Sequence, residues 1–206
     1  LREEPDNFAM RELLARTQIA MGDGEGALLT LDQLTEVSAQ PADYFALRAE
    51  ANVLRGQFDK ALQSLEGRTT AADYRAVALA NIGLEDADAA REALRAGLTV
   101  DANDAALLAT AARFELATGK LDQARTYADR AVKSDPKLHD ALLVSGQVFA
   151  RRNQLSDAVA AFEAGMNVHP SSVEMRIGKI AVLGDLDRID DSAALLSETA
   201  KMAPDN

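Results

Sequence analysis

Residues 105–136 read AALLATAARFELATGKLDQARTYADRAVKSDP and hold two helical patterns joined by the short segment TGKLD. Gly119 in this segment suits the left-handed backbone that often ends a helix, and Pro136 closes the second pattern because proline cannot continue a helix. Apolar residues recur at helical spacing on both sides of the segment, as Leu108, Ala111, Ala112 and Leu116 and then as Leu121, Ala124, Ala128, Ala131 and Val132. The stretch therefore predicts a hairpin of two amphipathic helices.

The same hairpin recurs along the chain with a period of 34 residues. Pro136, Pro170 and Pro204 are each 34 residues apart, and small residues keep the same spacing. Ala61 and Ala90 are only 29 residues apart, so one unit is five residues shorter. We predict a repeat tail at residues 1–7 and then six repeats, at residues 8–41, 42–70 (shortened), 71–104, 105–138, 139–172 and 173–206.

This pattern resembles the tetratricopeptide repeat (TPR), which has small residues at repeat positions 8 and 20 and glycine near position 15. Position 15 holds Gly22, Gly56 and Gly119, with Asn153 as a left-handed substitute. Position 8 holds Ala15, Ala49, Ala78, Ala112, Gly146 and Ile180, and position 20 holds Ala27, Ala61, Ala90, Ala124, Ala158 and Ser192. The resemblance implies an all-α, right-handed α-solenoid of antiparallel helix pairs with about six repeats. We also expect a segment of a longer, bacterial array.

The shortened repeat leaves two interpretations open. Its second helix is expected to begin near Phe58 and to end before Gly67, and TAAD at residues 70–73 matches a capping box that starts the next helix. About one helical turn is therefore missing. Either the repeat has drifted but still packs, or the superhelical path changes locally near residues 66–71.

Composition excludes several classes of function. The net charge of −11 disfavours binding to nucleic acid, and the absence of cysteine excludes disulfides, thiol nucleophiles and thiolate metal sites. No apolar run approaches the ~18 residues of a membrane-spanning helix, so we expect a soluble segment without direct membrane insertion. Cytoplasmic and periplasmic or envelope-associated locations both stay open.

Three segments that carry candidate chemistry are better explained as turns. GDGEG at residues 22–26 lacks the lysine of a phosphate-binding loop, and GDLDRIDD at residues 184–191 lacks the glycine and distal glutamate of a calcium loop. His139 and His169 have no third ligand at metal-site spacing, and we expect both to be solvated turn residues. We therefore predict no catalytic residue, no cofactor and no metal, and a protein that is not an enzyme.

The resemblance also implies a binding surface. In TPR arrays the first helix of each repeat lines a concave groove, with positions 2, 5, 9, 12 and 13 facing the ligand. These positions carry six acidic residues and four arginines in this chain. We expect a peptide or helix with a carboxylate beside aliphatic side chains to bind there, and replacement of Arg75 and Arg113 by Glu to weaken binding without lowering thermal stability. The predicted partner-binding residues are Arg75, Leu79, Ile82, Arg113, Leu116, Ala109, Leu143 and Gln147.

The resulting functional prediction is a non-catalytic scaffold for protein–protein interaction, with a protein or peptide partner in the groove. Two alternatives remain. The chain is a docking or regulatory segment of a larger enzyme or of an envelope, secretion or polysaccharide-export assembly, or it is a self-association module that dimerises through exposed terminal repeats.

Overall fold

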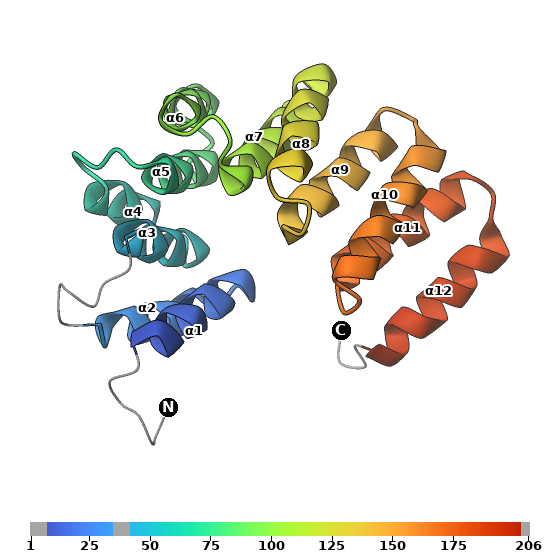
Figure 1. Cartoon of the computed structure of the whole chain (residues 1–206), viewed down its shortest axis with the longest axis horizontal. Helices are drawn as coiled ribbons and strands as arrows, with labels where there is room; N and C mark the ends of the chain where they lie inside the picture. The colour runs from blue at the N-terminus through green and yellow to red at the C-terminus, as the bar shows by residue number, and fades with distance from the viewer. Residues whose placement is uncertain (1–7, 35–41, 203–206) are drawn as a thin grey trace. The chain divides into compact units, whose positions relative to one another are not determined.

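The computed structural model describes residues 8–34 and 42–202, which form twelve α-helices and no strand (Figure 1). The helices are α1 (Phe8–Ala20), α2 (Gly24–Asp32), α3 (Tyr44–Leu54), α4 (Phe58–Ser64), α5 (Ala71–Gly83), α6 (Ala87–Val100), α7 (Ala105–Ala117), α8 (Leu121–Ser134), α9 (His139–Arg151), α10 (Leu155–Val168), α11 (Val173–Asp185) and α12 (Ile189–Met202). This architecture confirms the predicted all-α helical-repeat class. Each predicted repeat interval contains one pair of consecutive helices, while the predicted tail at residues 1–7 and Pro204 lie outside the described residues.

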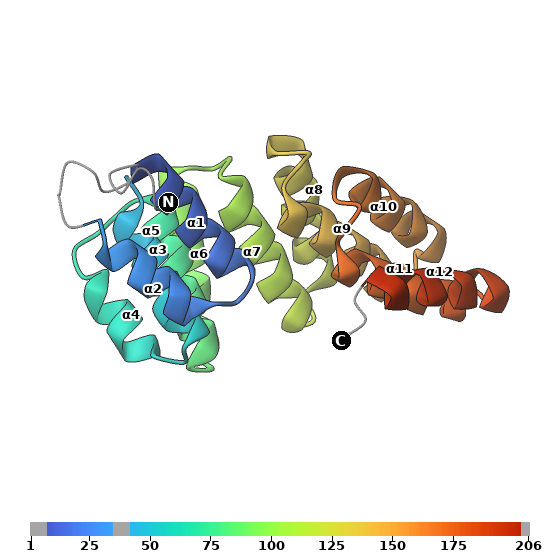
Figure 2. The ribbon, with the colours of Figure 1, turned by 90° about the horizontal axis from the view of Figure 1, so that it is seen from below.

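The chain divides into two compact units, Leu1–Ala102 with α1–α6 and Asn103–Asn206 with α7–α12, here called unit 1 and unit 2. Within each unit, consecutive helices pack against one another (Figures 1 and 2). The first helices of neighbouring repeats also touch directly, α1 with α3 and α3 with α5 in unit 1, and α7 with α9 and α9 with α11 in unit 2. Each repeat therefore obtains its core from its neighbours in the chain.

The turn inside each helix pair uses a left-handed residue. Gly22, Gly56 and Gly119 have φ of +78°, +69° and +78°, and Asn153 has φ of 59°, as the sequence predicts. Two residues that the sequence does not single out adopt the same conformation, because Glu85 and Asp187 have φ of 62° and 58°. The turn geometry is thus kept even where the side chain does not favour it.

Small residues let the helices approach closely. The position-8 and position-20 alanines are buried, and in unit 2 two glycines make room for an aromatic ring. A Cβ added at Gly146 would lie 2.5 Å from the ring of Phe162, and one added at Gly178 would lie 2.6 Å from it. The Phe162 ring thus fills a slot between α9 and α11 that only glycine leaves open.

The same repeat positions build the core at three of the four junctions that lie within a unit. A large apolar residue at position 24 clusters with residues at positions 3, 6 or 10 of the following repeat. Leu31 clusters with Leu47, and Leu65 with Ala76, in unit 1. Phe162 clusters with Val182 in unit 2. Each helix pair therefore presents one face to the preceding repeat and another to the following one.

The shortened repeat packs in spite of its missing turn. Helix α4 has only seven residues, yet Leu65 directly after it is buried among Ala49, Ala61 and Ala76. The ring of Phe58 lies so close to Gly83 that an added Cβ would be 2.2 Å away. The predicted capping box is confirmed, since Thr70 and Asp73 each bind the other's backbone N–H at the start of α5. The shortened repeat therefore still packs, as the first of the two interpretations expects.

Candidate functional site

Ion pairs between first helices identify which helix positions share a face. Arg16 on α1 donates to Asp43, directly before α3, at 2.7 Å, and Arg75 on α5 donates to Glu50 on α3 at 2.5 Å. These residues occupy the predicted groove positions 2, 5 and 9, so those positions face one another across neighbouring helices. Residues three and four places further along each helix lie on the same side. We call this surface of α1, α3 and α5 the first-helix face of unit 1.

Glu50 is the most deeply buried charged residue on this face. It is only 5% exposed, and burial raises the pKa of its carboxyl while the charge and hydrogen bond of Arg75 oppose that increase. Arg75 is therefore already engaged by a buried carboxylate that needs its charge. A partner that bound Arg75 would have to compete with Glu50.

Next to the paired charges, the first-helix face of unit 1 is apolar and open. Leu54 on α3 is 45% exposed and Ile82 on α5 is 38% exposed. Val53 and Leu79 beside them are half-buried. Aliphatic side chains of this kind on adjoining helices provide an anchoring strip for an apolar ligand.

The first-helix face of unit 2 differs from the prediction at two residues. Ala109 and Leu116 are buried, at 2% and 8% exposed, so neither offers surface to a partner, whereas Leu143 and Gln147 are half-buried. Arg113 on α7 lies 3.8 Å from the carboxylate of Asp140 on α9, and both side chains are nearly half exposed. This ion pair is long and exposed to solvent. A ligand carboxylate would therefore replace Asp140 more easily than it would replace Glu50 beside Arg75.

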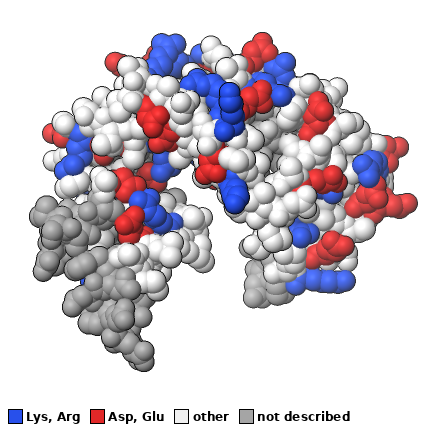
Figure 3. Space-filling model, in the orientation of Figure 1, with Lys and Arg blue, Asp and Glu red and all other residues white. Residues whose placement is uncertain are grey.

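Each predicted binding arginine therefore has its charge balanced by a nearby acidic residue. Sequence reasoning treated Arg75 and Arg113 as cations available to a ligand, but each has an acidic neighbour from an adjacent repeat. Acidic and basic side chains likewise lie beside one another over the viewed surface (Figure 3). The acidic partners were visible in the sequence at positions 9 and 2, but their pairing depends on how adjacent repeats stack.

The two histidines lie at inter-repeat connections, as predicted, but they are not fully solvated. His139 begins α9 and His169 follows α10, but their half-buried rings meet edge to face with centroids 5.2 Å apart. The Nε2 of His139 lies 2.8 Å from the hydroxyl of Ser172, and the Nε2–H of His169 donates to the carbonyl of Lys137 at 2.7 Å. The two histidines thus tie successive inter-repeat connections together.

The other two segments are turns, as predicted. Asp23 in GDGEG caps α2 by accepting a hydrogen bond from the backbone N–H of Gly26 at 2.8 Å. Asp187 forms the left-handed turn between α11 and α12. In residues 8–34 and 42–202, no three potential metal ligands come together, and no helix has the length and apolar character needed to cross a bilayer.

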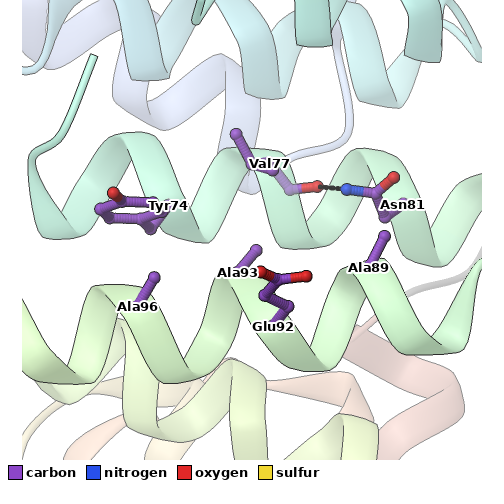
Figure 4. Close-up of a pocket in the computed structure, with 7 residues that line it drawn as sticks. All are labelled: Tyr74, Val77, Asn81, Ala89, Glu92, Ala93 and Ala96. Atoms are coloured by element: carbon purple, nitrogen blue, oxygen red, sulfur yellow. Dashed lines mark hydrogen bonds between the residues drawn. The ribbon is translucent and has the colours of Figure 1, made fainter. Parts of the chain in front are cut away.

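Unit 1 also has a shallow hollow of about 340 Å³ between α5 and α6 (Figure 4). Asn81 in its wall donates to the carbonyl of Val77 at 3.0 Å, so its amide is held by its own helix. The hollow exists because α6 presents small side chains to it, those of Ala89, Ala93 and Ala96. The spacing of these alanines is the sequence signal that could have predicted the hollow. Tyr74 and Glu92 complete the lining without forming a convergent polar cluster, and we assign it no ligand.

Comparison with known proteins identifies the family. Family models described as tetratricopeptide repeat match residues 1–51, 75–139 and 109–166, which together make up more than half of the chain. The chain belongs to the tetratricopeptide repeat family. It is thus a repeat scaffold of the kind that serves protein–protein interaction. Residues 52–74, which include α4, fall between the matched ranges.

Several solved structures share the fold at low sequence identity. The TPR protein TTC0263 of Thermus thermophilus is 16% identical with a TM-score of 0.72, over 85% of this chain and 98% of that one. PilF of Pseudomonas aeruginosa is 16% identical with a TM-score of 0.71, over 80% and 77%. YrrB, reported as a TPR protein with an unusual peptide-binding site, is 15% identical with a TM-score of 0.61, over 85% and 93%. No curated protein matches the sequence.

Proposed function

We propose that each first-helix face of this protein binds a peptide or protein segment. The face of unit 1 binds it through aliphatic contacts, and the face of unit 2, formed by α7, α9 and α11, binds it through Arg113. The observation that carries the proposal is the pair of exposed aliphatic residues Leu54 and Ile82 on adjacent first helices. An amphipathic helix or extended peptide that covers them would remove apolar surface from water, which favours binding. The peptide-binding site reported for YrrB is a further point of support.

The ligand that fits unit 1 is predominantly apolar. Arg75 is held by Glu50, and Arg16 hydrogen-bonds with both Glu12 and Asp43. A ligand carboxylate would gain little from either arginine, because it would leave an existing carboxylate without its partner. Val53 on α3 and Leu79 on α5, both half-buried, extend the apolar strip.

In unit 2, Arg113 is the arginine that suits a carboxylate of the ligand. Its ion pair with Asp140 spans 3.8 Å in partly exposed surroundings, so a ligand carboxylate at hydrogen-bonding distance would bind more tightly than Asp140 does. Leu143 and Gln147 on α9 supply the neighbouring aliphatic and amide contacts.

The test uses peptides selected from a random peptide library on the 206-residue chain. Binding of a selected peptide is then measured for Leu54→Asp, Ile82→Asp and the control Leu29→Asp. Leu29 is also an exposed aliphatic residue, but it lies on α2, a second helix. We expect Leu54→Asp and Ile82→Asp to weaken binding by about tenfold or more and Leu29→Asp to leave it unchanged. Equal affinities for all three variants would show that the first-helix face of unit 1 is not the binding surface.

A further inference from the structure

Two contacts define how α5 lies against α3 and the start of α4. Arg75 on α5 donates to Glu50 on α3. Eight residues after each of them, which is about two helical turns, a Cβ added at Gly83 would lie 2.2 Å from the ring of Phe58. Because both contacts have the same offset along the chain, residues at equal offsets from the ion pair lie beside one another.

The apolar strip on the first-helix face of unit 1 follows this alignment toward the turn after α5. Leu54 and Leu79 come four residues after the ion pair, and Ile82 lies nearly one helical turn further on. Leu84, the C-cap of α5, is 44% exposed and extends the strip into the turn. These residues belong to the second and third of six repeats, so their exposure does not come from an end of the chain.

Acidic residues lie where the strip ends. Glu85 and Asp86 directly follow Leu84, and Asp59 lies at the start of α4, which packs against α5. All three acids are exposed, and no Lys or Arg in the described part of the chain forms an ion pair with any of them. Glu50, at the other end of the strip, is by contrast already paired. We call Asp59, Glu85 and Asp86 the acidic edge.

Unit 1 also carries most of the net charge of the chain. Residues 1–102 include 18 acidic and 10 basic residues, a net charge of −8, whereas residues 103–206 include 15 and 12, a net charge of −3. An anionic lipid surface or a second copy of this acidic chain would therefore be repelled from unit 1. A cationic segment would be attracted to it.

We propose that the partner of the first-helix face of unit 1 is a cationic amphipathic protein segment. Its apolar side chains cover Leu54, Ile82 and Leu84, and its Lys or Arg residues meet the acidic edge. This inference rests on the function proposed above and adds the charge of the partner. The strip supplies most of the affinity, while the acidic edge orients the segment and speeds its association.

Two synthetic peptides with the same leucine pattern at helical spacing test the sign of the charge. One has lysine at its polar positions and the other has glutamate. We expect the lysine peptide to bind the 206-residue chain at least about tenfold more tightly at low salt, and added salt to reduce this difference. Equal affinities at low salt would overturn the proposal.

Two variants with the same change in net charge show whether the acidic edge is responsible. Glu85 and Asp187 both occupy repeat position 15 with a left-handed backbone, but Asp187 lies in unit 2. We expect Glu85→Lys to weaken binding of the lysine peptide by about fivefold or more and Asp187→Lys to leave it nearly unchanged. Equal losses in both variants would mean that only the overall charge matters, and the acidic edge would then not be a site.

Glutamine variants separate this inference from the proposed function. Leu84→Gln and Ile82→Gln should each weaken binding of the lysine peptide by about fivefold or more, whereas the control Leu29→Gln on α2 should not. If these two variants lose affinity while Glu85→Lys does not, the binding surface stands and the cationic partner is wrong. If neither variant loses affinity, the surface itself is wrong and both proposals fail.

Discussion

Arg75 on α5 donates a hydrogen bond to Glu50 on α3, and this ion pair joins two repeats at a point where the carboxylate is almost fully buried. Its counterparts, from Arg16 to Asp43 and from Arg113 to Asp140, are more exposed. Two of these pairs lie on the first-helix face of unit 1, and the pair of Arg113 and Asp140 lies on the first helices of unit 2. Substitutions in the three pairs should therefore affect stability differently, since only Arg75 neutralises a buried carboxylate.

Replacing Arg75 by Met should destabilise the protein. The change leaves Glu50 buried without its counter-charge, and we expect the free energy of unfolding to fall by about 3 kcal/mol. Chemical denaturation measures this directly. The double variant Glu50→Leu/Arg75→Met is the control and should recover most of the loss, because it removes both charges. Full stability of Arg75→Met would contradict this role. For the same reason we expect Arg75→Glu to lower thermal stability, in contrast to the expectation from sequence alone.

The same carboxylate predicts a pH dependence. Burial raises the pKa of Glu50, partly opposed by Arg75, so the folded state binds this proton more readily than the unfolded state does. Ionised Glu50 thus lowers stability above its folded-state pKa. The stability of wild type relative to Glu50→Gln should rise as the pH falls from neutral toward the ordinary range of a glutamate. Urea unfolding of both proteins across this range checks the sign, and a constant difference would refute it.

The glycine slot around Phe162 predicts a pair of opposite effects within one helix. Gly178→Ala places a Cβ 2.6 Å from the Phe162 ring and should lower the free energy of unfolding by about 1–3 kcal/mol. Gly184→Ala, on the same helix α11, meets nothing within 4 Å and should leave stability unchanged or raise it by up to about 1 kcal/mol. Adding Phe162→Leu should partly rescue Gly178→Ala. Similar losses for both glycine variants would argue against a steric cause.

The left-handed turn residue Glu85 predicts a stabilising substitution. A non-glycine residue with φ of 62° is strained, so Glu85→Gly should raise the free energy of unfolding by about 1 kcal/mol. Glu92→Gly, in the interior of α6, should instead lower it by about the same amount, because glycine is unfavourable within a helix. Thermal unfolding of the two variants provides the comparison. A loss of stability in Glu85→Gly would mean that the strain argument is incorrect.

Local features that depend on neighbouring residues were predictable from the sequence. The capping box of Thr70 and Asp73 has its residues three places apart, and glycine or asparagine at position 15 directly favours the left-handed turn. Glu85 and Asp187 could not be assigned in this way, because neither residue type favours that conformation strongly enough to identify it.

Contacts between repeats were harder to predict, because they depend on stacking. Arg16 and Asp43 are 27 residues apart, whereas Arg75 and Glu50 are 25 apart across the shortened repeat, so no single spacing identifies such pairs. The meeting of His139 with His169 depends in the same way on how two connections lie against each other. The groove residues Ala109 and Leu116 were chosen by position alone, which does not determine burial.

The seven-residue helix α4 also has a consequence for how the molecule opens. Such a short helix has few internal hydrogen bonds and depends mainly on Phe58, Ala61 and Leu65 for its attachment. We expect its amide protons to exchange with deuterium earlier than those of the fourteen-residue helices α6 and α8. Local unfolding would then begin inside the array, where α3 and α5 would lose the helix that lies between them in the chain.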